Sequence, residues 1–369
     1  MSTEESRPGS ADGAGADAAV SFLTLHRDSA RHEYFAQRPW PAPFFDRNLQ
    51  SWIVLDPKDV AALLRMPVLR PGTAGVAAAH KEIERRYGLS FEALDSVFPH
   101  IPLCAHGEAH REPRRRMATM LARCRSEIVE GVDRCLDDVV ARLEPGGEIE
   151  LMNEVVGPLV RVVLGGLAGV SLREEDVQES VSIVFDRMIG TRKRQRIEQA
   201  LRTLAERLRS SPDWDKTGEE EAAVLALFIL GNDALAGTLG ESLYQLFRTN
   251  AGSRMCDIAY PEIPNETGIP YVERVAEAAF AHDGRHFEAG TRLRVYLLPF
   301  AYAEEADRSD VFGVGAHTCL GKPLTIDVWR RLTARLAGLP LHVEVVDYEM
   351  RTDDYLFNVP ARIMIRTWQ

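Results

Sequence analysis

The chain has 369 residues, 45% of them hydrophobic and 27% charged, which is typical of a globular protein with a large core. Its net charge of −11 argues against nucleic-acid binding, because an acidic surface repels phosphate groups. The first residues lack the apolar core of a signal peptide, and the longest apolar run, 222–230, is too short to cross a bilayer. Five cysteines without a framework spacing complete the expectation of a cytoplasmic protein with reduced thiols and no membrane partner.

The N-terminal residues differ in composition from the rest of the chain. Residues 1–19 hold Gly, Ala, Ser and acidic residues but no aromatic side chain, so we expect a disordered tail. No low-complexity linker interrupts residues 20–369, and we expect these to form a single domain. Residues 51–65, SWIVLDPKDVAALLR, predict a short strand, a turn at Asp56-Pro57 and a helix.

Most of the remaining chain has helical periodicity. Apolar spacing predicts a loop at 210–218 and helices over 108–143, 153–168, 174–190, 194–210 and 219–248. A further helix is predicted over 321–338, with Pro323 near its first turn and Gly338 at its end. Strand-like patterns occupy 290–298, 341–346 and 361–368. The expected fold class is therefore mainly α with small β-sheets.

One cysteine stands in a glycine-rich loop, FGVGAHTCLGKPL, at residues 312–324. The helix that begins just after Cys319 favours the thiolate, the form that binds metal and reacts. A zinc site needs about four ligands, and this loop offers only His317 and Cys319. A dinucleotide-binding loop would need glycine where Thr318 stands, and a cysteine protease would need a histidine that spacing alone does not reveal. From composition alone, the favoured interpretation is a buried cysteine in a glycine-rich turn.

The complete pattern is more specific. Phe312-Gly313-x-Gly315-x-His317-x-Cys319-x-Gly321 resembles, position for position, the haem-binding signature of the cytochrome P450 family. It also stands where that family has it, near the end of the chain and before a long helix. The resemblance implies a cytochrome P450-like fold and haem b (iron protoporphyrin IX) as the cofactor. It further implies that Cys319 is the axial thiolate ligand of the iron, and that Phe312, Gly313 and Gly321 contact the cofactor.

Three other stretches are similar to family positions that hold the haem propionates. His110-x-x-x-Arg114 matches the pair at the start of helix C, for which the alternative is a solvated basic helix face. Arg274 matches an arginine on a strand, for which the alternative is a surface position. His317 matches a propionate partner in the cysteine loop. The neighbouring arginines are expected on the surface, where some of them would face an acidic electron donor: Arg111, Arg115 and Arg116.

The apolar helix at 219–248 resembles the I helix, which crosses the haem where oxygen binds. Gly231 and Asp233 match the family pattern, but Ala234 replaces the usual threonine. We expect Asp233 to relay protons, the alternative being a structurally bonded acid, because a buried carboxylate is costly unless it is paired or solvated. Ala234 removes a hydroxyl that usually helps to deliver protons during oxygen activation, and Thr238, one turn further on, would compensate for it in part.

Two other regions depart from the family. Where its K helix carries Glu-x-x-Arg, this chain has Pro261 and Pro264, which do not favour a helix interior. A later Glu305-x-x-Arg308 places an arginine where the family's meander has one. Residues 190–220 leave little room for the usual lid helices. A short lid predicts either an open pocket or an unusually large or carrier-bound substrate.

The resemblance implies a soluble, bacterial-type haem-thiolate monooxygenase that oxidises an apolar small molecule in secondary metabolism. Its electrons would come from a ferredoxin-type donor. A second hypothesis is a peroxide-dependent enzyme or a redox-neutral cyclase or isomerase, which would fit Ala234. A third is a non-catalytic protein that binds haem or a partner. The intact loop around Cys319 argues against the third hypothesis, because a protein without catalysis has no need to keep it.

Overall fold

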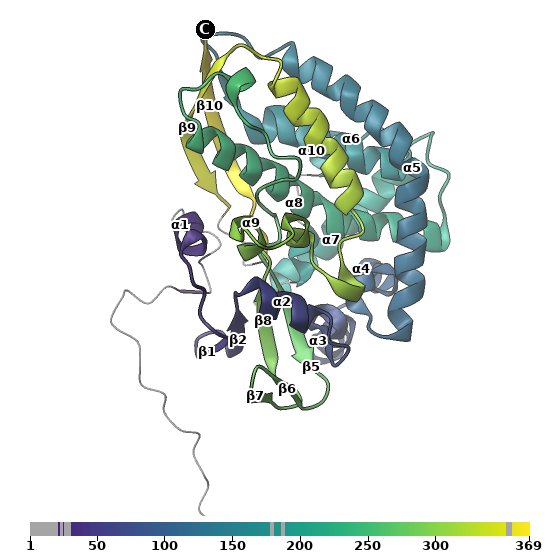
Figure 1. Cartoon of the computed structure of the whole chain (residues 1–369). Coiled ribbons are helices and arrows are strands. Elements are labelled where there is room, and N and C mark those ends of the chain that lie inside the picture. The colour runs from purple at the N-terminus through teal and green to yellow at the C-terminus, as the bar shows by residue number, and fades with distance from the viewer. Residues whose placement is uncertain (1–20, 23–24, 26–30, 178–180, 186–188, 352–355) are drawn as a thin grey trace, which may run out of the picture.

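The structure is a computed structural model that describes residues 21–22, 25, 31–177, 181–185, 189–351 and 356–369. The predicted disordered tail at 1–19 lies outside these residues. Helices predominate and the strands form three small sheets, which confirms the mainly α class (Figure 1). The apolar segment predicted at 219–248 is helix α8 (Gly218–Thr249), which runs through the middle of the molecule.

The helices around α8 bury most of the core. Helix α6 (Gly157–Ala168) packs on α8, and the long α5 (Glu108–Val140) packs on α6 and on α10 (Lys322–Leu336). Among the described helices, α8 alone is long and apolar enough to span a membrane, and 78% of its apolar window is buried. Such burial is typical of a core helix, and the acidic first turn and basic last turn of α8 suit the helix dipole.

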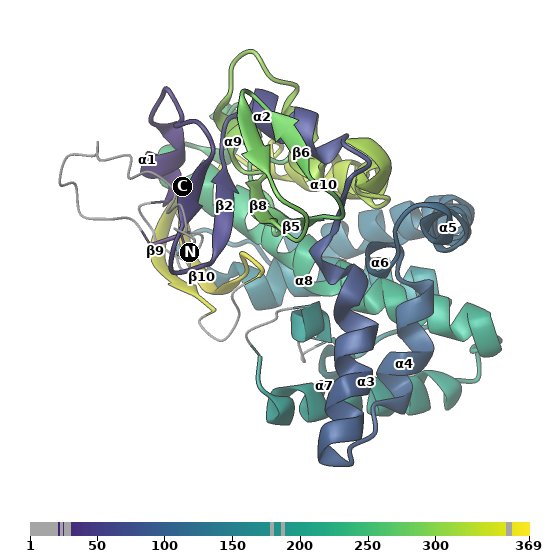
Figure 2. The ribbon, with the colours of Figure 1, turned by 90° about the horizontal axis from the view of Figure 1, so that it is seen from below.

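Shorter helices cover the two sides of this core. Helices α3 (Val76–Tyr87), α4 (Glu92–Val97) and α7 (Thr191–Arg209) lie together on one side (Figure 2). Helices α1 (Arg31–Ala36), α2 (Pro57–Leu64) and α9 (Pro299–Tyr302) lie on the other side, with the largest sheet. Residues 190–220 thus contain one long helix, as the shortened lid predicted.

The prediction of a helix over 174–190 is wrong for the described part of that range. Two short 3₁₀ turns stand there instead, Glu174–Asp176 and Val181–Phe185. The Arg173 N–H donates to the Asp176 carboxylate at 2.9 Å, while the Asp176 N–H donates to the Arg173 carbonyl at 3.2 Å. This local bonding competes with helix formation, and the sequence pattern did not reveal it. Helix α6 also starts later than predicted, after a π turn at Met152–Val156.

The sheets agree with the predicted strands and extend them. In the five-stranded sheet, strand β2 pairs in parallel with β8 and the other neighbours are antiparallel. Its order is β1 (Phe44–Asp46), β2 (Ser51–Val54), β8 (Arg292–Tyr296), β5 (Tyr271–Ala276) and β3 (Leu69–Pro71). A second sheet has the order β4 (Glu148–Glu150), β10 (Pro360–Trp368) and β9 (His342–Met350), and β6 (Phe280–His282) pairs with β7 (Arg285–Phe287).

Candidate functional site

The loop before α10 presents Cys319 to a large cavity. The Cys319 N–H donates to the Phe312 carbonyl at 2.9 Å, which closes the loop. Gly313 and Gly315 have φ values of +76° and +78°, which glycine adopts without strain. A Cβ on Gly315 would also lie 2.9 Å from the Leu64 carbonyl oxygen at the end of α2, so the loop leaves no room for a side chain there.

Opposing effects act on the thiol of Cys319. Burial raises its pKa, whereas backbone N–H groups of Gly321 and Lys322 and the charge of Arg114 lower it, and the net shift is upward. Cys319 lines the cavity and is exposed there, with the backbone of Gly321 and Lys322 beside its sulfur. A cation bound in the cavity would reverse this balance, because a coordinating thiol is deprotonated by its metal.

Five cationic or protonatable side chains gather beside the same cavity. We call them the histidine–arginine cluster, and its members are His106, His110, Arg114, Arg274 and His317. The ring centroids of His110 and His317 are 4.0 Å apart, and those of His106 and His317 are 6.1 Å apart. Burial, followed by the neighbouring His110 and Arg274, lowers the pKa of His317 to about 3. Burial also lowers the pKa of Arg274, which is 5% exposed, to about 10.

The only described carboxylate next to the cluster is that of Glu277, whose Oε2 lies 3.8 Å from His106 Nε2. Arg274 donates to the backbone carbonyl of Glu273 at 3.0 Å, and no described carboxylate pairs with Arg114 or Arg274. One ring nitrogen of each histidine is buried without a hydrogen-bond partner: His106 Nδ1, His110 Nε2 and His317 Nδ1. Buried polar atoms without partners are costly, and the two arginines favour acidic oxygens, so the cluster fits a ligand that carries several of them.

Sequence reasoning did not single out His106. Its Nε2 lies 3.0 Å from the Pro67 carbonyl, and its position four residues before His110 was its only signal. A histidine at that spacing is indistinguishable in sequence from one on a solvated helix face.

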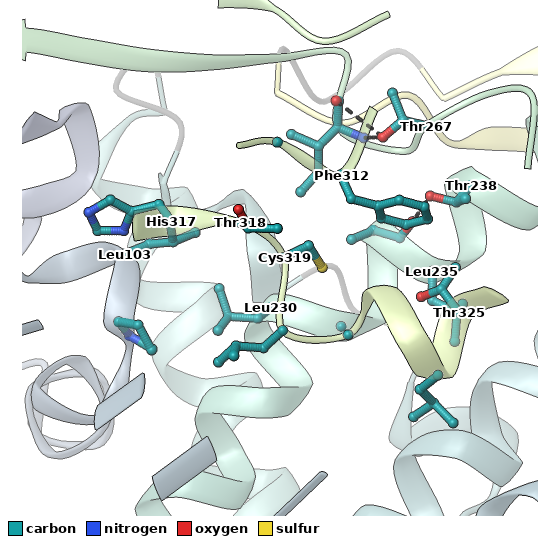
Figure 3. A pocket seen from close by; sticks show the side chains of 18 of the residues that line it. Leu103, Leu230, Leu235, Thr238, Thr267, Phe312, His317, Thr318, Cys319 and Thr325 are labelled. Atoms are coloured by element: carbon teal, nitrogen blue, oxygen red, sulfur yellow. Dashed lines mark hydrogen bonds between the residues drawn. The ribbon is translucent and has the colours of Figure 1, made fainter. Parts of the chain in front are cut away.

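The cavity is apolar apart from one end. It has about 1370 Å³ of space free of protein atoms, part of it open to solvent. Figure 3 shows Cys319 in the middle, His317 and Leu103 toward one end, and Leu235 and Thr238 toward the other. The predicted residues that line it are Arg114, Ala234, Arg274, Phe312, Gly313, His317, Cys319 and Gly321. Most other lining residues are aliphatic: Leu103, Leu121, Val163, Leu164, Leu167, Leu227, Leu230 and Leu235.

Two predicted site residues do not line the cavity. His110 is 5% exposed and reaches it only through His317. Asp233 is 2% exposed, and its Oδ1 accepts a hydrogen bond from Arg351 Nη1 at 3.0 Å. The geometry thus gives Asp233 the partner that a structurally bonded acid needs, while its relay role stays a prediction.

Thr238 is close to the position expected of a compensating hydroxyl, but this hydroxyl is already bonded. It donates to the Ala234 carbonyl at 2.7 Å and accepts from the Gly268 N–H at 2.9 Å. The proton of this hydroxyl is therefore held by the helix backbone and does not point into the cavity. Ala234 itself faces the cavity with a methyl group, so no hydroxyl proton is offered at this point of α8.

The segment that replaces the K helix is extended and lies against α8. Residues 259–270 form neither helix nor strand, as Pro261 and Pro264 predicted. A Cβ on Gly268 would lie 2.4 Å from the Ala234 carbonyl oxygen, so this segment touches the helix backbone. Glu305 and Arg308 are exposed, and Arg308 pairs with no described carboxylate, so the later Glu-x-x-Arg does not restore the family's ion pair.

The arginines beside Arg114 lie on the surface, and each has an acidic partner. Arg111 pairs with Glu108 at 2.9 Å, and Arg115 pairs with Glu112 at 2.8 Å. Arg116 pairs with Glu219 at 2.8 Å. These carboxylates cancel most of the positive charge that this face would show to an acidic partner.

Comparison with known proteins identifies the fold. No family model matches the chain, and no curated protein matches its sequence. Solved structures do match, and they are cytochrome P450 structures. The chain therefore has the cytochrome P450 fold, as the resemblance of the Cys319 loop predicted.

Three of these structures show how far the likeness extends. P450 RauA, solved with a biosynthetic intermediate of aurachin RE, has 15% identity and a TM-score of 0.72, covering 95% of this chain and 100% of RauA. P450BioI, in complex with acyl carrier protein ligated with hexadec-9Z-enoic acid, has 17% identity and a TM-score of 0.64, covering 94% and 99%. A thermophilic cytochrome P450 from Sulfolobus tokodaii has 18% identity and a TM-score of 0.63, covering 94% and 98%.

The residues present fit the haem that this fold implies. The cavity offers one thiol, Cys319, and no described group of three or more His, Cys, Asp and Glu side chains is arranged to hold a metal ion. A single protein ligand suits a metal whose other ligands come from a macrocycle. The histidine–arginine cluster, with its buried unbonded nitrogens, offers donors for two carboxylates.

Proposed function

We propose that this protein is a haem-thiolate oxidoreductase of the monooxygenase type, holding haem b in the cavity beside Cys319. The observation that carries the proposal is the joint presence, on one apolar cavity, of an accessible thiol and of two arginines, Arg114 and Arg274, that pair with no described carboxylate. Cys319 would ligate the iron, and Arg114, Arg274, His110 and His317 would hold the propionates. When bound, such a haem supplies oxidation chemistry, because the thiolate donates electron density and favours O–O cleavage.

The chain's own residues define the kind of substrate. The remaining cavity wall is aliphatic, and its only described cationic or protonatable side chains are those assigned to the propionates. A substrate would therefore be oriented by shape and apolar contact rather than by a charged anchor. An apolar small molecule fits, and the single long helix between α6 and α8 leaves room for a carrier-bound one. RauA, solved with a biosynthetic intermediate, supports a role in secondary metabolism, and P450BioI, solved with an acyl carrier protein, supports a carrier-bound substrate.

Ala234 and Thr238 support a second candidate within the same class. Because Ala234 has no hydroxyl and that of Thr238 is bonded to the helix, α8 delivers no side-chain proton to the cavity. A peroxide-dependent enzyme or a redox-neutral cyclase or isomerase would not need that delivery. The neutralised face around Arg115 points the same way, since it offers little attraction to an acidic ferredoxin-type donor.

The test is the absorption spectrum of the purified protein, reduced and exposed to CO. A red-shifted thiolate-type Soret band is expected, and a Cys319→Ala variant should lose it completely. Absence of haem, or an imidazole-type band in the wild type, would overturn the assignment. Turnover with peroxide alone, compared with turnover in the presence of a ferredoxin system, then separates the two candidates.

A further inference from the structure

A buried ion pair ties the N-terminal helix α1 to the centre of the molecule. The Arg31 guanidinium donates to the Glu241 carboxylate on α8, and both side chains are 0% exposed. Tyr348 on β9 donates its O–H to the other oxygen of Glu241 at 2.6 Å. A buried carboxylate needs this compensation, so α1 supplies the cation that lets α8 carry an acid in its core.

The next residue of α1 makes a second buried contact. His32 Nδ1 lies 3.0 Å from Glu266 Oε1 and 2.7 Å from the Tyr302 hydroxyl, and Tyr302 donates its O–H to Glu266 at 2.9 Å. Burial raises the pKa of Tyr302, so its hydroxyl keeps the proton that it donates. Glu266 is 0% exposed, and it therefore depends on α1 and α9 for its partners.

Glu266 belongs to the extended segment that stands in place of the K helix. Its own N–H donates to Ser242 Oγ on α8 at 3.1 Å. The next residues, Thr267 and Ile269, line the cavity, and Gly268 between them is held by Thr238 on one side and by the Asn358 N–H, at 2.9 Å, on the other. The position of Glu266 thus determines where this wall of the cavity lies.

The same contacts reach the cysteine side of the cavity. Tyr302 ends α9, which packs on α1 and on the 3₁₀ turn Arg308–Phe312 that leads into the Cys319 loop. Figures 1 and 2 both show α1 near α9. A contact at residues 31–32 is therefore connected to both walls of the cavity.

We propose that Arg31 and His32 are positioning residues, and that α1 acts as a clasp that sets the cavity wall at residues 265–270. We call the set Arg31, His32, Glu241, Glu266, Tyr302 and Tyr348 the N-terminal clasp. It performs, from the other end of the chain, the bracing that a helical Glu-x-x-Arg pair would have performed at 261–264. That the clasp influences ligand binding to a haem rests on the proposed function. That it positions residues 265–270 does not.

The first test is amide hydrogen exchange of the full chain. Tyr302→Phe removes the hydroxyl that donates to Glu266 with little change of shape, and His32→Leu removes the ring nitrogen that lies beside both Tyr302 and Glu266. Both should raise exchange in residues 265–270 by about tenfold or more relative to α5, because local opening raises exchange locally. His32→Gln keeps a donor and should largely restore protection. Glu33→Gln is the matched control, since Glu33 joins α1 to Arg248 of α8 at 3.7 Å on the surface.

The second test is spectral titration of the haem-loaded protein with imidazole. Tyr302→Phe and His32→Leu should shift the imidazole Kd by about fivefold or more at a temperature where each variant is fully folded, and Glu33→Gln by less than about twofold. Exchange that rises equally everywhere, or not at all, in Tyr302→Phe would overturn the proposal, as would an unchanged imidazole Kd. If His32→Leu yields no folded protein, Tyr302→Phe decides alone. If the wild type binds no haem, the proposed function fails while the exchange test still judges the clasp.

Discussion

Two groups of charged and polar side chains lie near the same cavity, and they differ in how far their charges are matched. In the N-terminal clasp each acid has at least one donor: Glu241 has Arg31 and Tyr348, and Glu266 has Tyr302, although Glu266 Oε2 and His32 Nε2 are buried without a hydrogen-bond partner. In the histidine–arginine cluster, Glu277 lies 3.8 Å from His106, but neither Arg114 nor Arg274 pairs with a described carboxylate. We therefore assign the clasp to the stability of the fold and the histidine–arginine cluster to the binding of a ligand. Buried charges without a partner in the protein are found mainly at functional sites, where a ligand supplies the partner.

The two groups also differ in how their stability depends on a cofactor. The clasp should contribute equally to the protein with and without haem, since all its partners belong to the chain. The histidine–arginine cluster should weaken the cofactor-free protein and stabilise the loaded one, since a ligand that binds only the folded state stabilises it. Each prediction below tests this contrast.

The largest effect is expected from breaking the clasp at Arg31. Arg31→Met leaves the carboxylate of Glu241 buried without its cation, which should lower the free energy of unfolding by about 3–5 kcal/mol. The double variant Arg31→Met/Glu241→Met removes both charges and should recover most of this loss. Denaturant unfolding measures both. Equal losses in the single and double variants would mean that packing, not charge, holds α1 in place.

The clasp shows where sequence reasoning stopped. Arg31 and Glu241 are 210 residues apart, and neither belongs to a motif, so no local pattern pairs them. Helices α3 and α4 were missed for a related reason. Their short amphipathic faces are stabilised by packing on other elements, and an isolated helix of that length is marginal. By contrast, α5, α8 and α10 have long apolar stripes, and their predicted ranges were nearly right.

The residues around Cys319 were predictable because the loop's requirements are local. Glycines with positive φ, a helix that begins after the thiol and the spacing of His317 all lie within a dozen residues. The family pattern then pointed to Arg114 and Arg274, which do line the cavity. It also pointed to Asp233, but the pattern contains no sign of Arg351, which follows it by 118 residues.

A pH titration tests the histidine–arginine cluster through His317. The pKa of His317 is about 3 in the folded, cofactor-free protein, below its usual 6.5, so the unfolded chain binds this proton first. Stability is therefore fully present above pH 6.5 and falls as the pH drops toward 3. Because His317 is partly exposed, solvent reduces this effect, and we expect the free energy of unfolding to fall by about 2 kcal/mol between pH 6.5 and 4.5.

Two comparisons isolate the contribution of His317. In the His317→Asn variant the free energy of unfolding should change much less between pH 6.5 and 4.5, because the group that titrates has been removed. The haem-loaded wild type should also show a smaller slope, since the propionates would partner a protonated imidazole. An identical slope in the loaded, cofactor-free and His317→Asn proteins would show that His317 does not face the proposed anion.

Arg274→Met should have the opposite sign to Arg31→Met. The guanidinium of Arg274 is buried beside no described acid, so its removal should stabilise the cofactor-free protein by about 1–2 kcal/mol. The same change should speed haem loss to apomyoglobin by about tenfold, because a propionate would lose its cation. Arg308→Met, on the exposed surface, is the control and should change neither. Destabilisation of the cofactor-free Arg274→Met protein would place Arg274 with the matched charges instead.

The smallest effect concerns the backbone of the loop that holds Cys319. It is measured as the difference in stability loss between an alanine substitution at Gly315 and one at Gly284. Gly315 and Gly284 both have positive φ, +78° and +71°, so alanine strains each of them in the same way. A Cβ at Gly284 would meet nothing within 4 Å, whereas one at Gly315 would lie 2.9 Å from the Leu64 carbonyl oxygen. Gly315→Ala should therefore cost about 1 kcal/mol more than Gly284→Ala in denaturant unfolding. Unlike Arg274→Met, it should do so equally with and without haem, because the contact with α2 belongs to the chain. A penalty that appeared only in the loaded protein would mean that the loop settles against α2 when the ligand binds.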